Sequence, residues 1–366
     1  MDIGIIGLPQ SGKTTIFNSL TKGSAAGSGH GGEVDKVKVG MAKVPDPRLQ
    51  QMADIFNPKK IVMAEVRYTD VPLTPRGLGK GEGFGSQLLN VLTMADALLH
   101  VVRAFDNPSV AHIEGSIDPY RDIDTMNLEL TYSDLTILER RRARIVDSLK
   151  GARSQERDAL LKEQGLIDRI RDGLEREVAI RDQSFSPDEQ KALNNYQFLT
   201  AKPILLVLNI GEKELPNSQA LEEELERRFG GSGVIGAVVC GKLEEELAQL
   251  DEVEAGDFRS VMGGGEPATE KVLRLSFQLL GLVSFLTCSE KDVRAWPIPR
   301  DTGAVKAAGK VHSDIEKGFI RAEVVGYDDM VSCGSIVEAR KRGVLRLEGK
   351  SYKVQDGDII NFLFKV

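Results

Sequence analysis

The chain has 366 residues, of which 41% are apolar and 28% charged, a composition typical of a folded globular protein rather than a disordered or fibrous one. This length predicts two or three domains. The net charge of −7 excludes a protein that coats nucleic acid through overall basicity.

The sequence indicates neither a membrane span nor a framework of disulfides or zinc. No apolar run reaches the ~18 residues needed to cross a bilayer, and the first residues lack the pattern of a signal segment. Cys240, Cys288 and Cys333 are far apart and form no C-x-x-C pair, which predicts reduced thiols. We therefore expect a monomeric protein of the cytoplasm with no membrane contact.

The first motif is a phosphate-binding loop. An apolar strand, Ile3–Ile6, is followed at once by Gly7-Leu8-Pro9-Gln10-Ser11-Gly12-Lys13-Thr14 and then by an amphipathic helix. The glycines let the backbone curl with its N–H groups inward, and Lys13 supplies a charge for the β- and γ-phosphates in binding and catalysis. A chance match would seldom fall between a strand and such a helix. The residues predicted to contact a nucleotide here are Gly7, Pro9, Gln10, Ser11, Gly12, Lys13, Thr14 and Thr15.

A carboxylate suited to Mg²⁺ follows the next β-rich run. The β-rich run Val62–Val66 opens this region, and Asp70 ends the strand predicted at Ala64–Tyr68, where a Walker-B aspartate would support a metal ion held by Thr14. The alternative is an ordinary turn residue. In a G-protein the pattern would be D-x-x-G, whose glycine senses the γ-phosphate, but the fourth residue here is Leu73.

A helical hairpin is predicted between the strand Ala97–Val102 and the return to the sheet at Pro203. Apolar residues recur three or four residues apart, or at multiples of these spacings, in two arms joined near residues 151–154. The sequence Ser186–Glu189 predicts a capping box for a further helix. The apolar positions are Leu135, Leu138, Ile145, Leu149, Leu160, Ile167, Ile170 and Leu174.

Two loops that follow the strands Ile204–Leu208 and Val234–Val239 are predicted to surround a base. The first has N-x-x-E where a G-protein has N-K-x-D, and a glutamate is one methylene longer than the aspartate that reads guanine, which weakens a preference for guanine. All five β runs are separated by helix-length stretches, so we predict a mostly parallel α/β sheet. The residues predicted to contact the base are Asn209, Ile210, Glu212, Cys240, Gly241 and Lys242.

After a helix at Thr269–Leu280 the pattern changes to short β runs and turns. Asp356-Gly357 lies between alternating apolar segments and predicts a hairpin in a small β-rich domain. Residues 283–366 hold 14 Lys and Arg against 12 Asp and Glu, which favours this part as a surface for RNA. Charged runs are nevertheless more often solvated helix faces. The candidate contacts to RNA or the ribosome are Arg140 and Arg144 in the hairpin, and Lys306, Lys310, Lys317 and Arg321 in the C-terminal part.

The phosphate loop, Asp70, the inserted hairpin, the N-x-x-E motif and the C-terminal pattern together resemble the YchF family, also called Obg-like ATPases. The likeness extends over essentially the whole chain, and its most specific stretches are Val293–Trp296 and Ala307–Ile320. The resemblance implies a P-loop G domain interrupted by a coiled-coil insertion and closed by a TGS domain of the β-grasp type. We therefore expect the G domain at 1–125 and 201–282, the insertion at 126–200 and the TGS domain at 283–366.

The resemblance also implies an activity and a partner. Members of this family bind ATP in preference to GTP, hydrolyse it slowly with Mg²⁺ and associate with ribosomes or RNA. The histidine considered there in place of a water-positioning glutamine maps onto His112. The chain departs from the family at Gln10-Ser11, where the family has Asn-Val, at Val34, where it has the switch threonine, and at Leu73. A nucleotide-binding module without turnover and a genuine GTPase therefore stay open as alternatives, as does a need for potassium.

Overall fold

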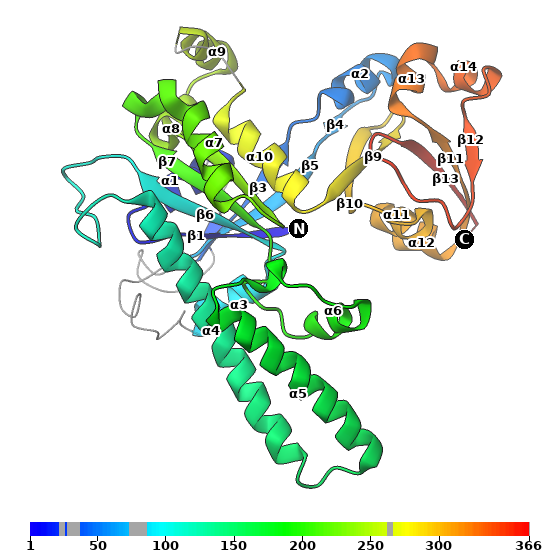
Figure 1. Ribbon diagram of the computed structural model, residues 1–366. Coiled ribbons are helices and arrows are strands. Elements are labelled where there is room, and N and C mark those ends of the chain that lie inside the picture. The colour runs from blue at the N-terminus through cyan, green and yellow to red at the C-terminus, as the bar shows by residue number, and fades with distance from the viewer. Residues whose placement is uncertain (22–25, 28–36, 73–85, 262–265, 366) are drawn as a thin grey trace. The chain divides into compact units, whose positions relative to one another are not determined.

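The computed structural model describes residues 1–21, 26–27, 37–72, 86–261 and 266–365, which fall into two compact units (Figure 1). The first unit comprises Met1–Gly40 and Arg67–Lys271, and the second comprises Met41–Val66 and Val272–Val366. This division differs from the expected one, because residues 41–66 are grouped with the C-terminal part, where the helix Pro47–Phe56 and the strand Ile61–Val62 pack. The strands that flank them, Lys38–Val44 and Ala64–Asp70, nevertheless belong to the seven-stranded sheet. The other expected boundaries stay predictions.

A seven-stranded sheet forms the first unit, in the order β2-β3-β5-β1-β6-β7-β8. The pairs β5·β1, β1·β6, β6·β7 and β7·β8 are parallel, whereas β2·β3 is antiparallel. The predicted α/β fold with a mostly parallel sheet is therefore confirmed. The strands are β1 (Asp2–Ile6), β2 (Ala26–Gly27), β3 (Lys38–Val44), β5 (Ala64–Asp70), β6 (Ala97–Ala104), β7 (Ile204–Ile210) and β8 (Val234–Val239).

A core cluster of this unit lies between the sheet and the first turns of a long helix, α4 (Pro119–Ser148). Ile6, Leu98 and Leu206 from three neighbouring strands pack in one cluster with Ile123 and Met126 of α4. The strands are buried on both faces, which is why they read as nearly continuous apolar runs. The other helices are α1 (Lys13–Thr21), α3 (Ser86–Met94), α7 (Ser218–Phe229), α8 (Gly241–Leu247) and α9 (Glu252–Val261), with short 3₁₀ turns at Ile180–Asp182 and Glu212–Asn217. The helix α10 (Ala268–Leu279) begins at the end of this unit and continues into the second.

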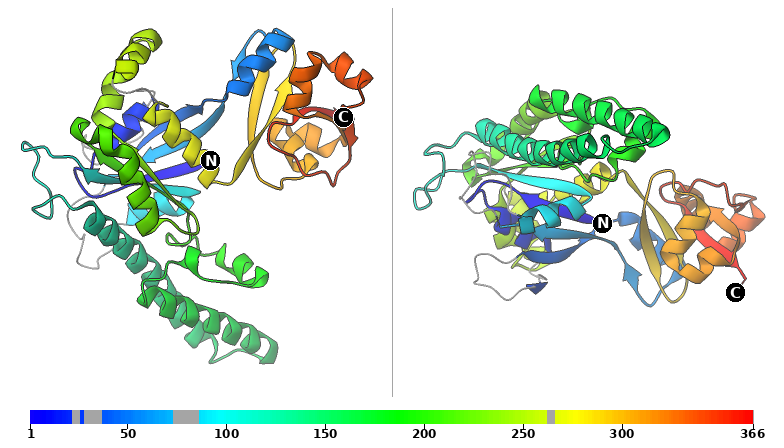
Figure 2. Two further views of the ribbon diagram at one scale, coloured as in Figure 1. Left: turned by 45° about the horizontal axis from the view of Figure 1, so that its top comes forward. Right: turned by 90° about the horizontal axis from the view of Figure 1, so that it is seen from below.

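The predicted helical hairpin is confirmed as α4 (Pro119–Ser148) and α5 (Ser154–Glu175), with α6 (Pro187–Leu193) beside them (Figures 1 and 2). Five of the eight apolar positions named above are buried in one cluster with Leu166, Ile180 and Phe198, and the other three, Leu135, Leu149 and Leu160, pack against it. The capping box of α6 is present, because the Ser186 side chain accepts from Glu189 N and the Glu189 side chain accepts from Ser186 N. The first helix begins earlier than residue 126, because Asp118 caps it and accepts from Arg121 N.

A six-stranded sheet forms the second unit, in the order β12-β11-β13-β9-β10-β4. Three alanines of α11 pack on Phe285 and Phe362 of this sheet, since small side chains let a helix approach closely. Trp296 is partly buried and stacks on Phe285, in agreement with a packing role. The elements are β4 (Ile61–Val62), β9 (Leu282–Cys288), β10 (Val293–Pro299), β11 (Phe319–Val325), β12 (Arg346–Glu348), β13 (Ile359–Phe364), α2 (Pro47–Phe56), α11 (Ala304–Val311), α12 (Ser313–Lys317), α13 (Tyr327–Cys333) and α14 (Ile336–Lys341).

Two local predictions are wrong. The run Val62–Val66 is not one strand, because β4 pairs with β10 and β5 pairs with β1 in the other sheet. Asp356-Gly357 forms a turn, with φ +81° at Gly357, but not a hairpin. The following strand, β13, is central, and it takes both partners, β11 and β9, from elsewhere in the chain.

The described residues contain no helix with the length and apolar content of a membrane span.

Candidate functional site

The loop between β1 and α1 has the curled backbone that its glycines predict. Gly7 has φ +150° and Gly12 has φ +90°. A Cβ on Gly7 would lie 2.2 Å from the Val101 carbonyl oxygen, and one on Gly12 would lie 2.2 Å from Asn209 Nδ2. Both the conformation and the lack of space therefore require glycine at these two positions.

The middle of the loop carries two residues whose surroundings differ. Gln10 is exposed and has φ +66°, a left-handed conformation that is uncommon for a residue with a side chain. Ser11 is buried, and its Oγ makes no hydrogen bond within the part of the chain that the structure describes. A left-handed conformation such as that of Gln10 persists only where the surrounding structure imposes it, and it is frequent in ligand-binding loops.

Lys13, the first residue of α1, is held over this loop. Its Nζ donates to the carbonyl oxygens of Gly7 at 2.9 Å and Leu8 at 3.2 Å. Burial lowers the pKa of Lys13 from 10.5 to about 8, an effect that the nearby Asp70 carboxylate partly opposes. The ammonium is therefore pre-positioned at the phosphate-binding end of the loop.

Thr14 and Asp70, the two residues predicted to hold magnesium, are in contact. Thr14 Oγ1 donates to Asp70 Oδ2 at 2.7 Å, which joins the start of α1 to the end of β5. Magnesium prefers hard oxygen ligands and takes one or two from protein, with the rest from phosphates and water. These two oxygens fit that requirement. The described residues hold no cluster of three His, Cys, Asp or Glu side chains.

The lowered pKa of Lys13 makes a pH dependence of nucleotide binding testable. Bound phosphate favours the charged ammonium and therefore raises its pKa, so binding takes up a proton wherever free Lys13 is neutral. We expect affinity for a nucleotide to fall roughly tenfold between about pH 8 and about pH 9.5. Calorimetric titrations in two buffers of different ionisation enthalpy measure the proton uptake. An affinity that stays constant over this range would contradict the prediction.

Asn209 connects the two predicted halves of the site. Its Nδ2 donates to the Ser11 carbonyl oxygen at 3.0 Å, and its Oδ1 accepts from Gly241 N at 3.0 Å. The phosphate-binding loop and the loop after β8 are thus held together by one buried side chain. Glu212 lies beside Lys242, whose Nζ approaches its carboxylate at 3.4 Å.

A cavity of about 720 Å³ lies at this edge of the sheet, within the size range of ligand pockets. Seven predicted residues line it: Gly12, Thr15, Asn209, Ile210, Glu212, Cys240 and Lys242. The motifs do not identify the other wall of the cavity, residues 105–108, nor the lining residues Gly211, Lys213, Glu214 and Glu245. Residues 105–108 follow β6 directly, so the rule that carboxyl ends of parallel strands share one edge could have found them.

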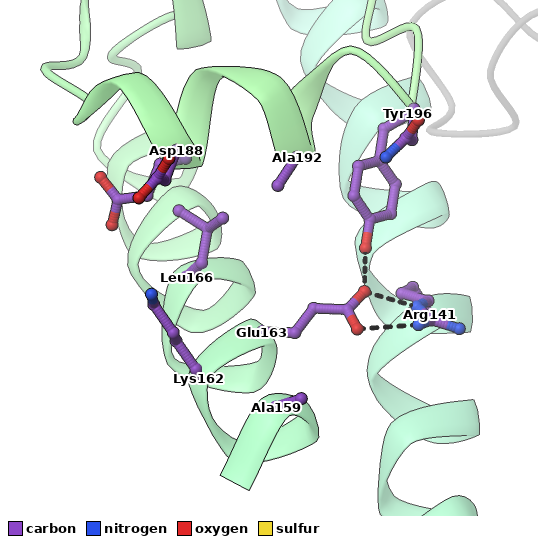
Figure 3. Close-up of a pocket in the computed structure, with 10 residues that line it drawn as sticks. Arg141, Ala159, Lys162, Glu163, Leu166, Asp188, Ala192 and Tyr196 are labelled. Carbon is purple, nitrogen blue, oxygen red and sulfur yellow. Dashed lines mark hydrogen bonds and ion pairs between the residues drawn. The ribbon is translucent and has the colours of Figure 1, made fainter. Parts of the chain in front are cut away.

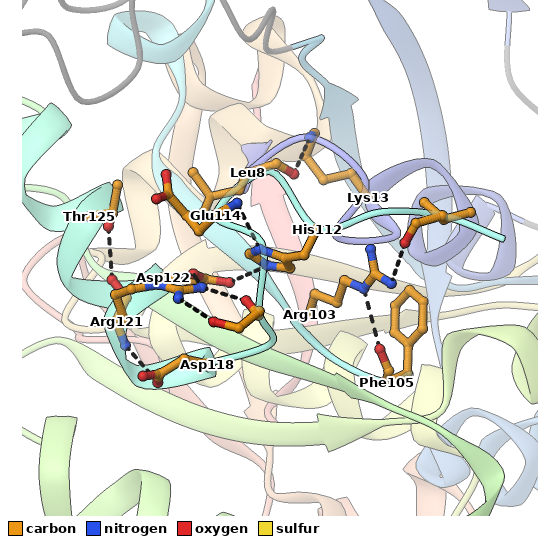
Figure 4. Close-up of polar contacts among 12 residues, drawn as sticks. Leu8, Lys13, Arg103, Phe105, His112, Glu114, Asp118, Arg121, Asp122 and Thr125 are labelled. Atoms are coloured by element: carbon orange, nitrogen blue, oxygen red, sulfur yellow. Dashed lines mark hydrogen bonds and ion pairs between the residues drawn. The ribbon is translucent and has the colours of Figure 1, made fainter. Parts of the chain in front are cut away.

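Arg103 stabilises residues 105–108, the wall of the cavity that the motifs do not identify. Its guanidinium lies 4.8 Å from the centre of the Phe105 ring and donates to the carbonyl oxygens of Phe105 at 3.3 Å and Val110 at 2.9 Å (Figure 4). The side chain comes from the end of β6 and is buried. It therefore holds the segment after β6 in a defined conformation beside the cavity.

His112 is held by α4 rather than left free. Its Nε2 lies 2.8 Å from Asp122 Oδ2, and its Nδ1 accepts from Glu114 N at 3.1 Å, so a proton on Nε2 satisfies both contacts (Figure 4). Arg121 binds the other oxygen of the same carboxylate at 2.8 Å. The catalytic role expected for His112 stays a prediction, and its contacts here tie the loop after β6 to the first turn of α4.

The candidate RNA contacts are all exposed. Arg140 and Arg144 have no ion-pair partner among the described residues, whereas their neighbours Arg141 and Arg142 pair with Glu163 and Asp168. In the second unit, the candidates lie on α11, α12 and β11, namely Lys306, Lys310, Lys317 and Arg321. Val34 and Leu73, which bear on γ-phosphate sensing, lie outside the described residues.

Two known protein families match this chain, one in its C-terminal part and one in its N-terminal part. The family YchF-GTPase_C, described as "Protein of unknown function (DUF933)", matches residues 282–365. The family MMR_HSR1, described as "50S ribosome-binding GTPase", matches residues 2–138.

Several whole proteins are similar over nearly their full length. The protein named "Ribosome-binding ATPase YchF" of Bacillus subtilis is 37% identical over 365 residues, which are 99% of each chain. Its namesake in Escherichia coli O157:H7 is 36% identical over 363 residues, again 99% of each chain. The solved structure of the Schizosaccharomyces pombe YchF GTPase has a TM-score of 0.84 and 29% identity, over 99% of this chain and 97% of that one.

Proposed function

The chain belongs to the YchF family, and from this premise we propose that it binds ATP with Mg²⁺ in preference to GTP and hydrolyses it slowly. The observation that carries the proposal is the loop in which Lys13 is held over the Gly7 and Leu8 carbonyls while Thr14 meets Asp70. Relatives whose names contain "ATPase" support hydrolysis as the reaction.

The preference for ATP rests on the carboxylate that would read guanine. A guanine site needs a carboxylate that accepts from two base donors, and leaving such donors unpaired costs binding energy. Here that position holds Glu212, which is longer than aspartate and pairs with Lys242 at 3.4 Å. The surrounding cavity supplies an aromatic ring at Phe105. These features support a base held by packing more than by a bidentate carboxylate.

Each residue of the loop would have a distinct part in phosphoryl transfer. Lys13 and the loop amides would bind the phosphates and stabilise the charge that develops on them. Thr14 and Asp70 would hold Mg²⁺, which when bound neutralises phosphate charge. His112 is occupied by Asp122 and Glu114 N, so its use in orienting water would require the loop after β6 to move. That requirement is consistent with slow turnover.

We further propose that the protein is a cytoplasmic monomer that associates with the ribosome, because the similar proteins are named as ribosome-binding. The exposed cations named above would contact ribosomal RNA: Arg140 and Arg144 on α4, and Lys306, Lys310, Lys317 and Arg321 in the second unit. Arginine and lysine suit phosphate contacts, which dominate affinity for nucleic acid.

Calorimetric titration with ATP, GTP and their diphosphates, with and without Mg²⁺, tests this function. We expect ATP to bind at least about tenfold more tightly than GTP. Tighter binding of GTP would contradict the proposal and support a genuine GTPase. Equal affinity for the di- and triphosphate would show that the γ-phosphate is not sensed.

Phosphate release decides between an enzyme and a module that only binds nucleotide, the alternative that Val34 and Leu73 motivate. We expect release above background that is lost in Asp70→Ala, because this variant removes one of the two protein oxygens for Mg²⁺. The exposed Asp54→Ala is the matched control. Turnover that persists in Asp70→Ala would show that another group supports the metal.

A further inference from the structure

A second cavity, of about 640 Å³, lies in the helical hairpin, between α5 and α6 and beside α4 (Figure 3). Its volume falls in the range of ligand pockets. None of the nucleotide-site residues lines it. The lining residues are Arg141, Ala159, Lys162, Glu163, Leu166, Asp188, Glu189, Ala192, Asn195 and Tyr196.

One side of this cavity is a charged wall formed by Arg141, Glu163 and Tyr196 (Figure 3). Arg141 donates to both Glu163 oxygens at 2.8 Å, and the Tyr196 hydroxyl donates to the same carboxylate. Burial and the Glu163 contact raise the pKa of Tyr196 to about 12, so the hydroxyl keeps its proton. The Tyr196 ring also stacks on Phe198 at 5.1 Å. The three side chains of this wall are therefore hydrogen-bonded to one another, which gives the cavity a fixed shape.

The floor of the cavity is apolar. Leu166 of α5 and Ala192 of α6 point toward one another, and Ala159 lies about two helical turns nearer the start of α5 (Figure 3). The small alanine side chains leave the space that a larger apolar group could fill. Burying one such side chain is favourable by about 1.5–3 kcal/mol.

Two opposite charges on the other side of the cavity are unpaired. The side chains of Lys162 and Asp188 make no ion pair or hydrogen bond with any residue that the structure describes, and both are exposed. Their neighbour Glu189, in contrast, is engaged by Arg169 at 2.8 Å and by Ser186 N. Lys162 and Asp188 are thus available to a ligand that carries both charges.

The balance of charge selects a protein over RNA as the occupant. Two cations, Arg141 and Lys162, line the cavity against three anions, Glu163, Asp188 and Glu189. A site for phosphates would need a positive excess. An apolar floor with one free charge of each sign instead complements a polypeptide.

We propose that this cavity binds a short segment of a partner protein that presents one large apolar side chain flanked by an acidic and a basic residue. The apolar side chain occupies the floor between Leu166 and Ala192. The acidic residue pairs with Lys162, and the basic residue pairs with Asp188. This site is separate from the proposed nucleotide function and does not require it.

The test uses the full chain with ¹³C-labelled alanine and leucine methyl groups and two tripeptides, N-acetyl-Glu-Leu-Lys-amide and N-acetyl-Lys-Leu-Glu-amide. Ala159, Leu166 and Ala192 report from the cavity, and Ala237 and Ala308, buried elsewhere, serve as references. We expect at least one peptide to shift the cavity methyls saturably, with a Kd of about 1 mM. Lys162→Gln and Asp188→Asn should each weaken binding by about two- to fivefold, as expected for exposed ion pairs.

Three results would overturn the proposal. They are equal binding of N-acetyl-Glu-Leu-Glu-amide, unchanged affinity in both charge variants, and shifts confined to other methyls. Saturable shifts of the same methyls by a single-stranded RNA 12-mer would assign the cavity to nucleic acid and also overturn it. Ala192→Trp fills the floor and should weaken binding at least tenfold. If that variant fails to fold, Lys162→Gln and Asp188→Asn still test whether the peptide binds in this cavity. Both replaced side chains are exposed, so these substitutions leave the packing of the core unchanged.

Discussion

Replacing Lys13 by alanine is expected to lower the affinity for ATP about a hundredfold or more. The Lys13 ammonium is buried and lies at the mouth of the phosphate-binding loop, held by the Gly7 and Leu8 carbonyls. A hydrogen bond to a charged group contributes about 1.5–3 kcal/mol, and this ammonium would make two such contacts with the β- and γ-phosphates. Calorimetric titration of the variant with ATP and Mg²⁺ measures the loss.

A matched control is Lys213→Ala. Lys213 also lines the nucleotide cavity, but it is exposed and follows β7 rather than the phosphate-binding loop. We expect its replacement to change the affinity less than about threefold. Thermal unfolding of Lys13→Ala verifies that the variant is folded. ATP affinity within tenfold of the unaltered protein would show that Lys13 does not carry phosphate binding.

Replacing Asn209 by alanine is expected to reduce both stability and nucleotide affinity. The side chain is buried, and the variant would leave the Ser11 carbonyl and the Gly241 N–H without their partners. Each buried polar group left unpaired costs about 1–3 kcal/mol, so the loss of two partners should lower the free energy of unfolding by about 2–6 kcal/mol. Denaturant titration measures this change, and calorimetry measures the accompanying loss of ATP affinity.

A second substitution at Asn209 and a control at Asn217 show which interaction of Asn209 matters. Asn209→Asp keeps an acceptor for Gly241 N but places a carboxylate oxygen against the Ser11 carbonyl oxygen, so we expect it to be at least as destabilising as alanine. Asn217→Ala, at an exposed position nearby in the chain, should change the free energy of unfolding by less than about 0.5 kcal/mol. A change below about 1 kcal/mol in Asn209→Ala would mean that the bridge between the two loops is dispensable.

Features that depend on a few consecutive residues could be predicted from the sequence. The phosphate-binding loop is one of them, because the positive φ angles at Gly7 and Gly12 follow from glycine itself. The capping box at Ser186 is another, since its two hydrogen bonds join residues three positions apart. The helical hairpin likewise follows from apolar spacing, because one face of each helix must be buried.

Features that depend on distant partners could not be predicted in this way. Asp356-Gly357 has the composition of a hairpin turn, yet the strand that follows is central and pairs with β11 and β9. Residues 47–62 carry no local sign that they pack with strands more than two hundred residues later, which they do through the pairing of β4 with β10. Strand pairing is decided by the whole sheet, because each central strand needs two partners.

The same distinction applies to the two sites. The sequence by itself determined the phosphate-binding loop and its lysine, because glycines within the loop permit the positive φ angles that its backbone needs. Only the tertiary structure decided that Asn209 ties this loop to Gly241, that residues 105–108 line the cavity, and that unpaired charges face an apolar floor between α5 and α6. The physical reason is that side-chain contacts between elements depend on packing, which brings together residues that the sequence keeps far apart.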